Sequence, residues 1–251
     1  MEKAELKQKY LEILRTVTEE DFTFSDDKYS GVFLPFHFDE FQAAPHRIMV
    51  VGRETAGWNS KNRKNTLGHI IKNNLNNTLE SVIDEAESRY SWHLKESPSG
   101  TIKTKHTSHF QRYYYKIALE LGLKPEAMIY GNLFAWDYNG VSPLTRPNFE
   151  LSKIVDISIA LLAEQIIFFK PNFIIFATGC NKIDSIIKRL FNESFQGYTT
   201  ESVDPKKLWE FKTANALCFR VAHPRALSKD HVDSRMKVIS RIKESISVRS
   251  A

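Results

Sequence analysis

"RIMVVG", residues 47–52, decides the fold class, because it is a short apolar run that ends in glycine. Its branched residues and nearly continuous hydrophobicity are typical of a strand that is buried on both faces. Three later runs have the same character: MIYGNLF (128–134), FIIFATG (173–179) and LCFRVAH (217–223). The sequence therefore predicts four short buried strands.

Helical patterns lie between and after these runs. HFQRYYYKIALELGL precedes the second run, with Gly122 as a plausible C-cap, and similar patterns begin near residues 148, 180 and 229. Strands that alternate with helices predict an α/β fold with a mostly parallel central sheet of about four strands, flanked by helices. We expect one domain over 1–251, with a helical N-terminal extension (1–45) and a loop-rich insertion (60–108) that contains a helix around KNNLNNTLE (72–80). Residues 192–214 also fit the alternation poorly.

Length, composition and charge argue against some classes of protein but do not identify one. A chain of 251 residues with 42% hydrophobic content can bury a full core as one domain. The net charge of +5 is compatible with a polyanionic partner, yet many soluble proteins are equally basic. Cys180 and Cys218 have no metal-ligand spacing, which argues against a zinc site or a disulfide framework. The charged N-terminus and the short apolar stretches predict a cytoplasmic protein without membrane spans.

The residues that follow each predicted strand are the best candidates for a site. In open α/β sheets, ligands bind outside the carboxyl ends of the strands. A carboxylate, a carboxamide and an imidazole occur there: Glu54 after the first run, Asn132 in the second and His223 after the fourth. These three groups are suited to a hydrolytic site.

Four segments together resemble the uracil-DNA glycosylase superfamily. VVGRETAGW matches the first-strand motif only loosely, YGNLFAW matches the strand with the family's asparagine, and VAHPRALS matches the final loop well. FIIFATGCNK resembles the strand and turn before that loop, so the resemblance covers about residues 47–245 in order and spacing. It implies the fold of that superfamily and the excision of a flipped base from DNA.

The resemblance assigns roles to the three polar groups. Glu54 stands where the family places its catalytic Asp or Asn, which orients the attacking water and stabilises the oxocarbenium-like sugar. Asn132 stands at the asparagine that reads the pyrimidine edge, and His223 at the imidazole that donates to the pyrimidine O2. Each also has a structural alternative: a turn glutamate, an asparagine bonded to backbone at a strand end, and a structural histidine.

The final loop implies contacts with DNA. Leu227 matches the apolar wedge that fills the gap left by the extruded nucleotide. Arg225 replaces a small serine of the family and is expected to contact a phosphate or the opposite strand. Ser228 either bonds a phosphate or caps the next helix, and Arg53 is grouped with these contacts.

The first motif bears on the substrate. Ala56 and Gly57 stand where uracil-specific enzymes carry bulky residues that exclude groups at pyrimidine C5, so a larger base is expected to fit. Trp58 and Phe134 are candidates to stack on that base. Asp137 assists or replaces Glu54, or bonds an exocyclic amino group of the base, or only shapes a turn with Asn139 and Gly140.

These inferences lead to one functional hypothesis and its alternatives. We expect a monofunctional, monomeric DNA glycosylase without metal or cofactor. It would act on a modified pyrimidine, such as hydroxymethylated or glucosylated cytosine in phage DNA, and so serve anti-phage defence. A uracil-DNA glycosylase for repair, or an inactive DNA-binding protein of the same fold, remain alternatives. A nucleotide- or phosphosugar-binding enzyme is disfavoured, because no glycine-rich phosphate motif occurs.

Overall fold

The computed structural model describes residues 3–22, 27–59, 65–93, 108–180 and 182–250. The chain forms two compact units, each assembled from three segments. Unit 1 consists of Met1–Phe36, Arg53–His93 and Gly131–Phe168, and unit 2 of His37–Gly52, Leu94–Tyr130 and Phe169–Ala251. The domain expected from the sequence thus contains two units, and the chain passes between them five times. No composition change marks these crossings in the sequence.

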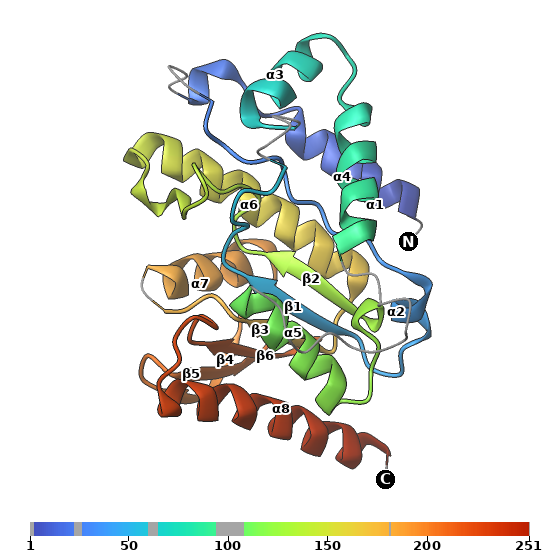
Figure 1. Ribbon diagram of the computed structural model, residues 1–251, viewed down its shortest axis with the longest axis vertical. Helices are drawn as coiled ribbons and strands as arrows, with labels where there is room; N and C mark the ends of the chain where they lie inside the picture. Colours follow the sequence, from blue (N-terminus) through green and yellow to red (C-terminus); the bar gives the residue numbers. More distant parts are fainter. Residues whose placement is uncertain (1–2, 23–26, 60–64, 94–107, 181, 251) are drawn as a thin grey trace. The chain divides into compact units, whose positions relative to one another are not determined.

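Unit 2 contains most of a six-stranded sheet, which makes the protein an α/β protein (Figure 1). The spatial order of the strands is β2-β1-β3-β6-β5-β4. All four predicted strands are present, namely β1 (Ile48–Gly52), β2 (Met128–Asn132), β3 (Phe173–Phe176) and β6 (Leu217–Val221). β1 pairs in parallel with β3, and β3 in parallel with β6.

The expected number of strands was wrong, because two further strands extend the sheet beyond β6. β4 (Thr199–Asp204) and β5 (Leu208–Lys212) form an antiparallel hairpin, and β5 is also antiparallel to β6. The sheet is therefore mixed. Every residue of β4 is exposed, so the strand lacks the apolar run by which the buried strands are recognised. A strand at the edge of a sheet can be polar on both faces.

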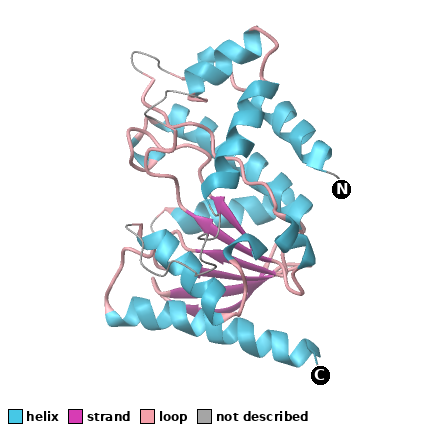
Figure 2. Ribbon diagram, turned by 45° about the vertical axis from the view of Figure 1, so that its right-hand side comes forward, coloured by secondary structure: helices cyan, strands magenta, loops and turns pink. Residues whose placement is uncertain are grey.

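Helices cover both faces of the sheet in unit 2. On one face, α7 (Ile183–Ser194) packs Phe191 against Phe176 of β3 and Phe211 of β5. On the other face, Arg241 of α8 (Lys229–Ser250) binds Glu210 of β5, whose side chain alternates with that of Phe211. Figure 2 shows the strands as one layer between helices.

α5 (His109–Glu120) lies on the same side as α8, because Lys243 binds Glu120 and the Tyr113 hydroxyl donates to the carbonyl of Arg235. Gly122 follows α5 with φ of 65°, as expected for a C-cap glycine. The short helices α2 (Asp39–Ala43) and η2 (Pro125–Ala127) also belong to unit 2.

Unit 1 is mainly helical and packs around its own core. It contains α1 (Lys3–Leu14), η1 (Glu19–Asp21), α3 (Leu67–Leu75), α4 (Glu80–His93), η3 (Pro143–Thr145) and nearly all of α6 (Asn148–Phe169). α1 and α4 are joined by ion pairs of Lys3 with Glu87 and of Lys7 with Asp84.

Residues 67–93 correct the prediction of a loop-rich insertion, because they form α3 and α4. The Thr66 side chain accepts a hydrogen bond from the amide of His69 and caps α3, which buries Leu67 and Ile70. The asparagine-rich sequence is a poor helix former, so tertiary packing supplies the stability that propensity lacks. The remainder of the insertion, at 60–64 and 94–107, lies outside the described residues. The N-terminal extension is helical only in part, since residues 30–38 are extended or irregular.

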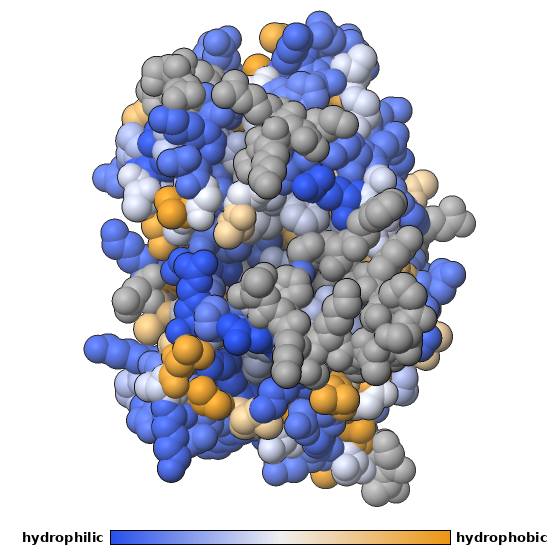
Figure 3. Space-filling model, viewed as in Figure 1, coloured by the Kyte–Doolittle hydropathy of each residue, from blue (hydrophilic) through white to orange (hydrophobic). Residues whose placement is uncertain are grey.

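The described surface carries few apolar groups. On the face drawn in Figure 3, hydrophilic residues predominate and apolar residues occur in small separate patches. Among the described residues, no helix has both the length and the apolar content needed to cross a membrane.

Candidate functional site

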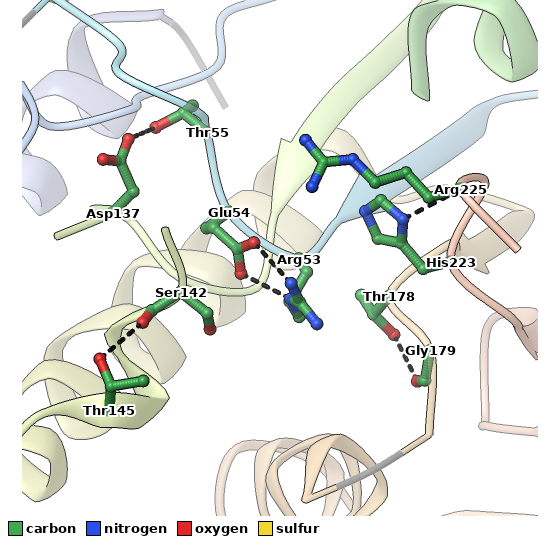
Figure 4. Close-up of polar contacts among 10 residues, drawn as sticks. All are labelled: Arg53, Glu54, Thr55, Asp137, Ser142, Thr145, Thr178, Gly179, His223 and Arg225. Atoms are coloured by element: carbon green, nitrogen blue, oxygen red, sulfur yellow. Dashed lines mark hydrogen bonds and ion pairs between the residues drawn. The ribbon is translucent and has the colours of Figure 1, made fainter. Parts of the chain in front are cut away.

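Glu54 is held by its neighbour in the chain, just beyond the end of β1. Arg53 Nε lies 2.7 Å from Oε2 of Glu54, and Arg53 Nη2 lies 3.0 Å from Oε1. The Glu54 side chain is 10% exposed and that of Arg53 is 30% exposed. The bidentate pair fixes the orientation of the carboxylate, as the close-up of these side chains shows (Figure 4). Arg53, expected at the DNA, is therefore first a partner of Glu54.

Asp137 fixes the turn that follows Glu54. One carboxylate oxygen, Oδ2, accepts from the Thr55 hydroxyl and from the Gly57 amide, each at 2.8 Å. The other, Oδ1, accepts from the Gly140 amide at 2.8 Å. The side chain is almost completely buried. Both carboxylate oxygens of Asp137 are therefore hydrogen-bonded within the turn, as expected if its role is to shape that turn.

The segment after Asp137 is a tight hairpin that the sequence indicates. Tyr138 and Val141 exchange two backbone hydrogen bonds, and Asn139 and Gly140 have positive φ values of 53° and 76°. Asn-Gly is the preferred pair for such a two-residue turn. The backbone geometry of this turn accounts for Asn139 and Gly140 at these positions, so no ligand-binding role is needed to explain them.

The residues expected beside the base differ in accessibility. Ala56 is exposed, whereas Phe134 is 0% exposed and belongs to the core. Trp58 packs edge-on against Phe33, and the guanidinium of Arg89 lies 5.3 Å from the Trp58 ring centre. Gly57 has a φ of 79° and gives its amide to Asp137, so a backbone requirement explains the glycine. Stacking of Phe134 on a base would first require its exposure.

Asn132 is the last residue of β2 and is only 5% exposed. Among the residues that the structure describes in unit 1, it is the one with two buried side-chain atoms, its nitrogen and its oxygen, that lack a hydrogen-bond partner. A buried amide without partners costs about 1–3 kcal/mol on scales derived from mutated proteins. Among the described residues, no backbone group is hydrogen-bonded to this side chain, so the structural alternative of a bond to backbone at the strand end finds no support. A buried carboxamide whose nitrogen and oxygen are both unbonded is suited to a ligand that offers both a donor and an acceptor.

His223 lies in a tight turn of unit 2, two residues beyond the end of β6. The His223 carbonyl accepts from the Ala226 amide at 2.8 Å, and Pro224 occupies the second position of the turn, where its fixed φ is favourable. Nδ1 of His223 accepts from the amide of Arg225 at 3.2 Å. The neutral ring therefore carries its hydrogen on Nε2 and presents a donor there.

A buried arginine holds this loop in place, and the sequence did not reveal it. Arg235 of α8 is 6% exposed, and its guanidinium donates to the carbonyls of Ala222, His223 and Ala226 at 3.5, 3.4 and 2.9 Å. It also lies 5.8 Å from the ring centre of Tyr113. Burial lowers the pKa of Arg235. Only the position of Arg235, close to VAHPRALS in the chain, could have suggested it.

The loop presents outward the residues expected at DNA. Arg225 and Ser228 are exposed, and Leu227 is 64% exposed. Ser228 directly precedes α8, and its carbonyl accepts from the amides of His231 and Val232. On the inner side, Gly179 approaches closely: a Cβ built there would lie 3.7 Å from that of His223.

The predicted residues thus meet in three groups within the two units: Arg53 with Glu54, Gly57 with Asp137, and His223 with Arg225. No cluster of three or more His, Cys, Asp or Glu suited to a metal ion occurs among the residues that the structure describes. Comparisons with family models, curated proteins and solved structures found no match to this chain.

Proposed function

We propose that this protein is a monofunctional DNA glycosylase that hydrolyses the N-glycosidic bond of a flipped, modified pyrimidine. The observation that carries the proposal is the buried carboxamide of Asn132, which has no hydrogen-bond partner among the residues that the structure describes. A pyrimidine edge offers adjacent donor and acceptor atoms, which match the two atoms that Asn132 leaves without partners. DNA is the proposed partner.

The proposed reaction uses Glu54 and His223 in different roles. Water attacks C1′ of the sugar while the bond from C1′ to the base nitrogen breaks and its electron pair leaves with the base. Nε2–H of His223 would donate to the base oxygen that gains negative charge. Glu54 would stabilise the positive sugar and orient the water, whose proton passes to solvent. The base and an abasic site are the products, and the chemistry needs no cofactor or metal.

The proposed substrate carries a substituent on its pyrimidine ring, as hydroxymethylated or glucosylated cytosine does. The support is limited to the small side chains at positions 56 and 57, where uracil-specific enzymes of the resembled superfamily carry bulky ones. Because Gly57 is also required by its backbone conformation, exposed Ala56 is the stronger argument. Such a substrate would place the protein in defence against phages, and uracil repair is the alternative.

A second function, an inactive DNA-binding protein of this type, is favoured by one observation. The carboxylate of Glu54 is engaged by both Nε and Nη2 of Arg53, which leaves it less available to orient a water. For either function we propose a monomer in the cytoplasm. There the thiol of Cys218, whose pKa is raised by burial, would stay reduced.

The test is a base-release assay by mass spectrometry on DNA with uracil and on phage DNA with modified cytosines. We expect a free modified base from the unaltered protein and none from Glu54→Gln or Asn132→Leu. Asn73→Gln is the matched control, because Asn73 is another buried asparagine of unit 1 that is hydrogen-bonded internally. Uracil alone would reject the enlarged pocket, and no base from any substrate would leave the inactive DNA-binding protein.

A further inference from the structure

The first turn of α5 presents two basic side chains at the surface of unit 2. Arg112 is exposed and His109 is partly exposed, and Nη2 of Arg112 lies 2.9 Å from Nδ1 of His109. Ser108 caps this helix by accepting from the amide of Gln111. The cap orders the turn, so the two basic side chains project from a fixed backbone.

Arg235 connects this turn of α5 to the loop that carries His223 and Arg225. The neighbour of Arg112 in the chain, Tyr113, donates its hydroxyl hydrogen to the backbone carbonyl of Arg235 at 3.3 Å. The guanidinium of Arg235 in turn donates to three carbonyls of the loop. The α5 turn and the loop are therefore parts of one packed arrangement within unit 2.

No carboxylate of a described residue neutralises the two arginines at this place. Among the described residues, neither Arg112 nor Arg225 forms an ion pair, although both are exposed. Other arginines of unit 2 differ in this respect: Arg189 pairs with Glu193, and Arg241 with Glu210. Exposed arginines usually gain little by pairing, so the missing partners cost little stability and leave a local positive potential.

The positive charges also act on one another. Burial lowers the pKa of His109, and the charges of Arg112, Arg225 and Arg235 lower it further. These three guanidinium groups come from α5, the loop and α8, so they converge on His109 from three elements. An anion bound among them would relieve this repulsion.

We propose that Arg112, His109 and Arg225 form a surface that binds backbone phosphates of DNA. Arginine suits this ligand, because its planar fork can bond two phosphate oxygens at once. Leu227, exposed two residues after Arg225, favours a nucleic acid over another polyanion, because an apolar side chain beside a phosphate site can enter the base stack. The inference rests on the proposed function and adds α5 to the residues that contact DNA.

Fluorescence anisotropy with an unmodified DNA duplex tests this surface, because it requires no base release. We expect the slope of log Kd against log salt to fall by about 1 for Arg112→Gln or Arg225→Gln, and by about 2 for the double variant. Arg189→Gln is the control: it removes an exposed arginine on the opposite face of the sheet and should leave the slope unchanged. Thermal unfolding establishes that the variants are folded.

The outcomes separate this inference from the proposed function. If the slopes fall but no substrate releases a base, the phosphate surface stands and the catalytic proposal fails. If a base is released but the double variant keeps the original slope, the catalytic proposal stands and the surface is rejected. A protein that shows no affinity for DNA overturns both.

Discussion

The loops that follow β2 and β6 are held in place by opposite kinds of contact. After β2, one buried carboxylate, Asp137, satisfies three donors of its own unit, while the side chain of Asn132, the last residue of β2, has no hydrogen-bond partner among the described residues. After β6, the order comes from outside the loop, because Arg235 of α8 binds three of its carbonyls and leaves its side chains exposed. The first segment is thus ordered by its own buried carboxylate. The second is ordered by a side chain of α8, and its own side chains stay exposed to a partner.

Replacement of Asp137 should have the largest effect on stability. Asp137→Ala removes the acceptor of two amides and a hydroxyl, and a buried donor that loses its partner costs about 1–3 kcal/mol. We expect urea denaturation to show a loss of about 4 kcal/mol, and Asp137→Asn to lose less, because an amide keeps one acceptor oxygen. A loss below about 1 kcal/mol for Asp137→Ala would contradict the turn-shaping role.

Replacement of Arg235 should have the next largest effect. Arg235→Met keeps most of the apolar stem but removes a guanidinium that bonds three carbonyls, and one bond to a charged group contributes about 1.5–3 kcal/mol. Because the contacts with the carbonyls of Ala222 and His223 are long, at 3.5 and 3.4 Å, we count mainly the bond to Ala226 and expect a loss of about 2 kcal/mol in the free energy of unfolding. Arg189→Met, at an exposed ion pair, should change it by about 0.5 kcal/mol or less. Equal losses would show that Arg235 does not hold the loop.

Replacement of Asn132 should raise the stability of the protein, whereas the two preceding replacements lower it. Asn132→Leu removes a buried amide that has no partner, so we expect the free energy of unfolding to rise by about 1 kcal/mol. Asn73→Leu removes bonds to the His69 carbonyl and from the Thr78 hydroxyl, and should lower it by about 2 kcal/mol. Losses of similar size in both variants would mean that Asn132 has a structural partner.

The smallest effect is expected from the titration of His109. The pKa of His109 is lowered from its ordinary value of 6.5 by burial and by the charges of Arg112, Arg225 and Arg235. On acidification the unfolded chain therefore binds a proton before the folded protein does. The folded state loses stability as the pH falls below about 6.5, and this loss is absent above it. Urea denaturation at pH 7.5 and 5.5 should show a smaller acid loss in His109→Gln than in the unaltered protein; an identical loss would contradict it.

Much of the sheet could be predicted, and the exceptions have a common cause. The runs at 47–52, 128–134, 173–179 and 217–223 are buried on both faces, so hydrophobicity alone marks them. β4 is exposed throughout and β5 follows it in a hairpin, so pairing at the edge of the sheet created these strands. In 67–93 the sequence indicates a helix around KNNLNNTLE but not the extent of α3 and α4, because packing rather than propensity stabilises them.

The sequence by itself determined the α/β class, the positions of four strands and the polar residues that follow them, because these depend on local hydrophobicity and on chain order. Only the tertiary structure decided which of those residues are already engaged: the turn engages Asp137, Arg53 engages Glu54, and no group in the described part of the chain engages the side chain of Asn132. It alone revealed Arg235, whose partners are backbone carbonyls without a sequence signature. Burial and hydrogen bonding depend on the folded backbone and on the neighbours that folding brings together, some of which, such as Thr55 and Asp137, are distant in the chain.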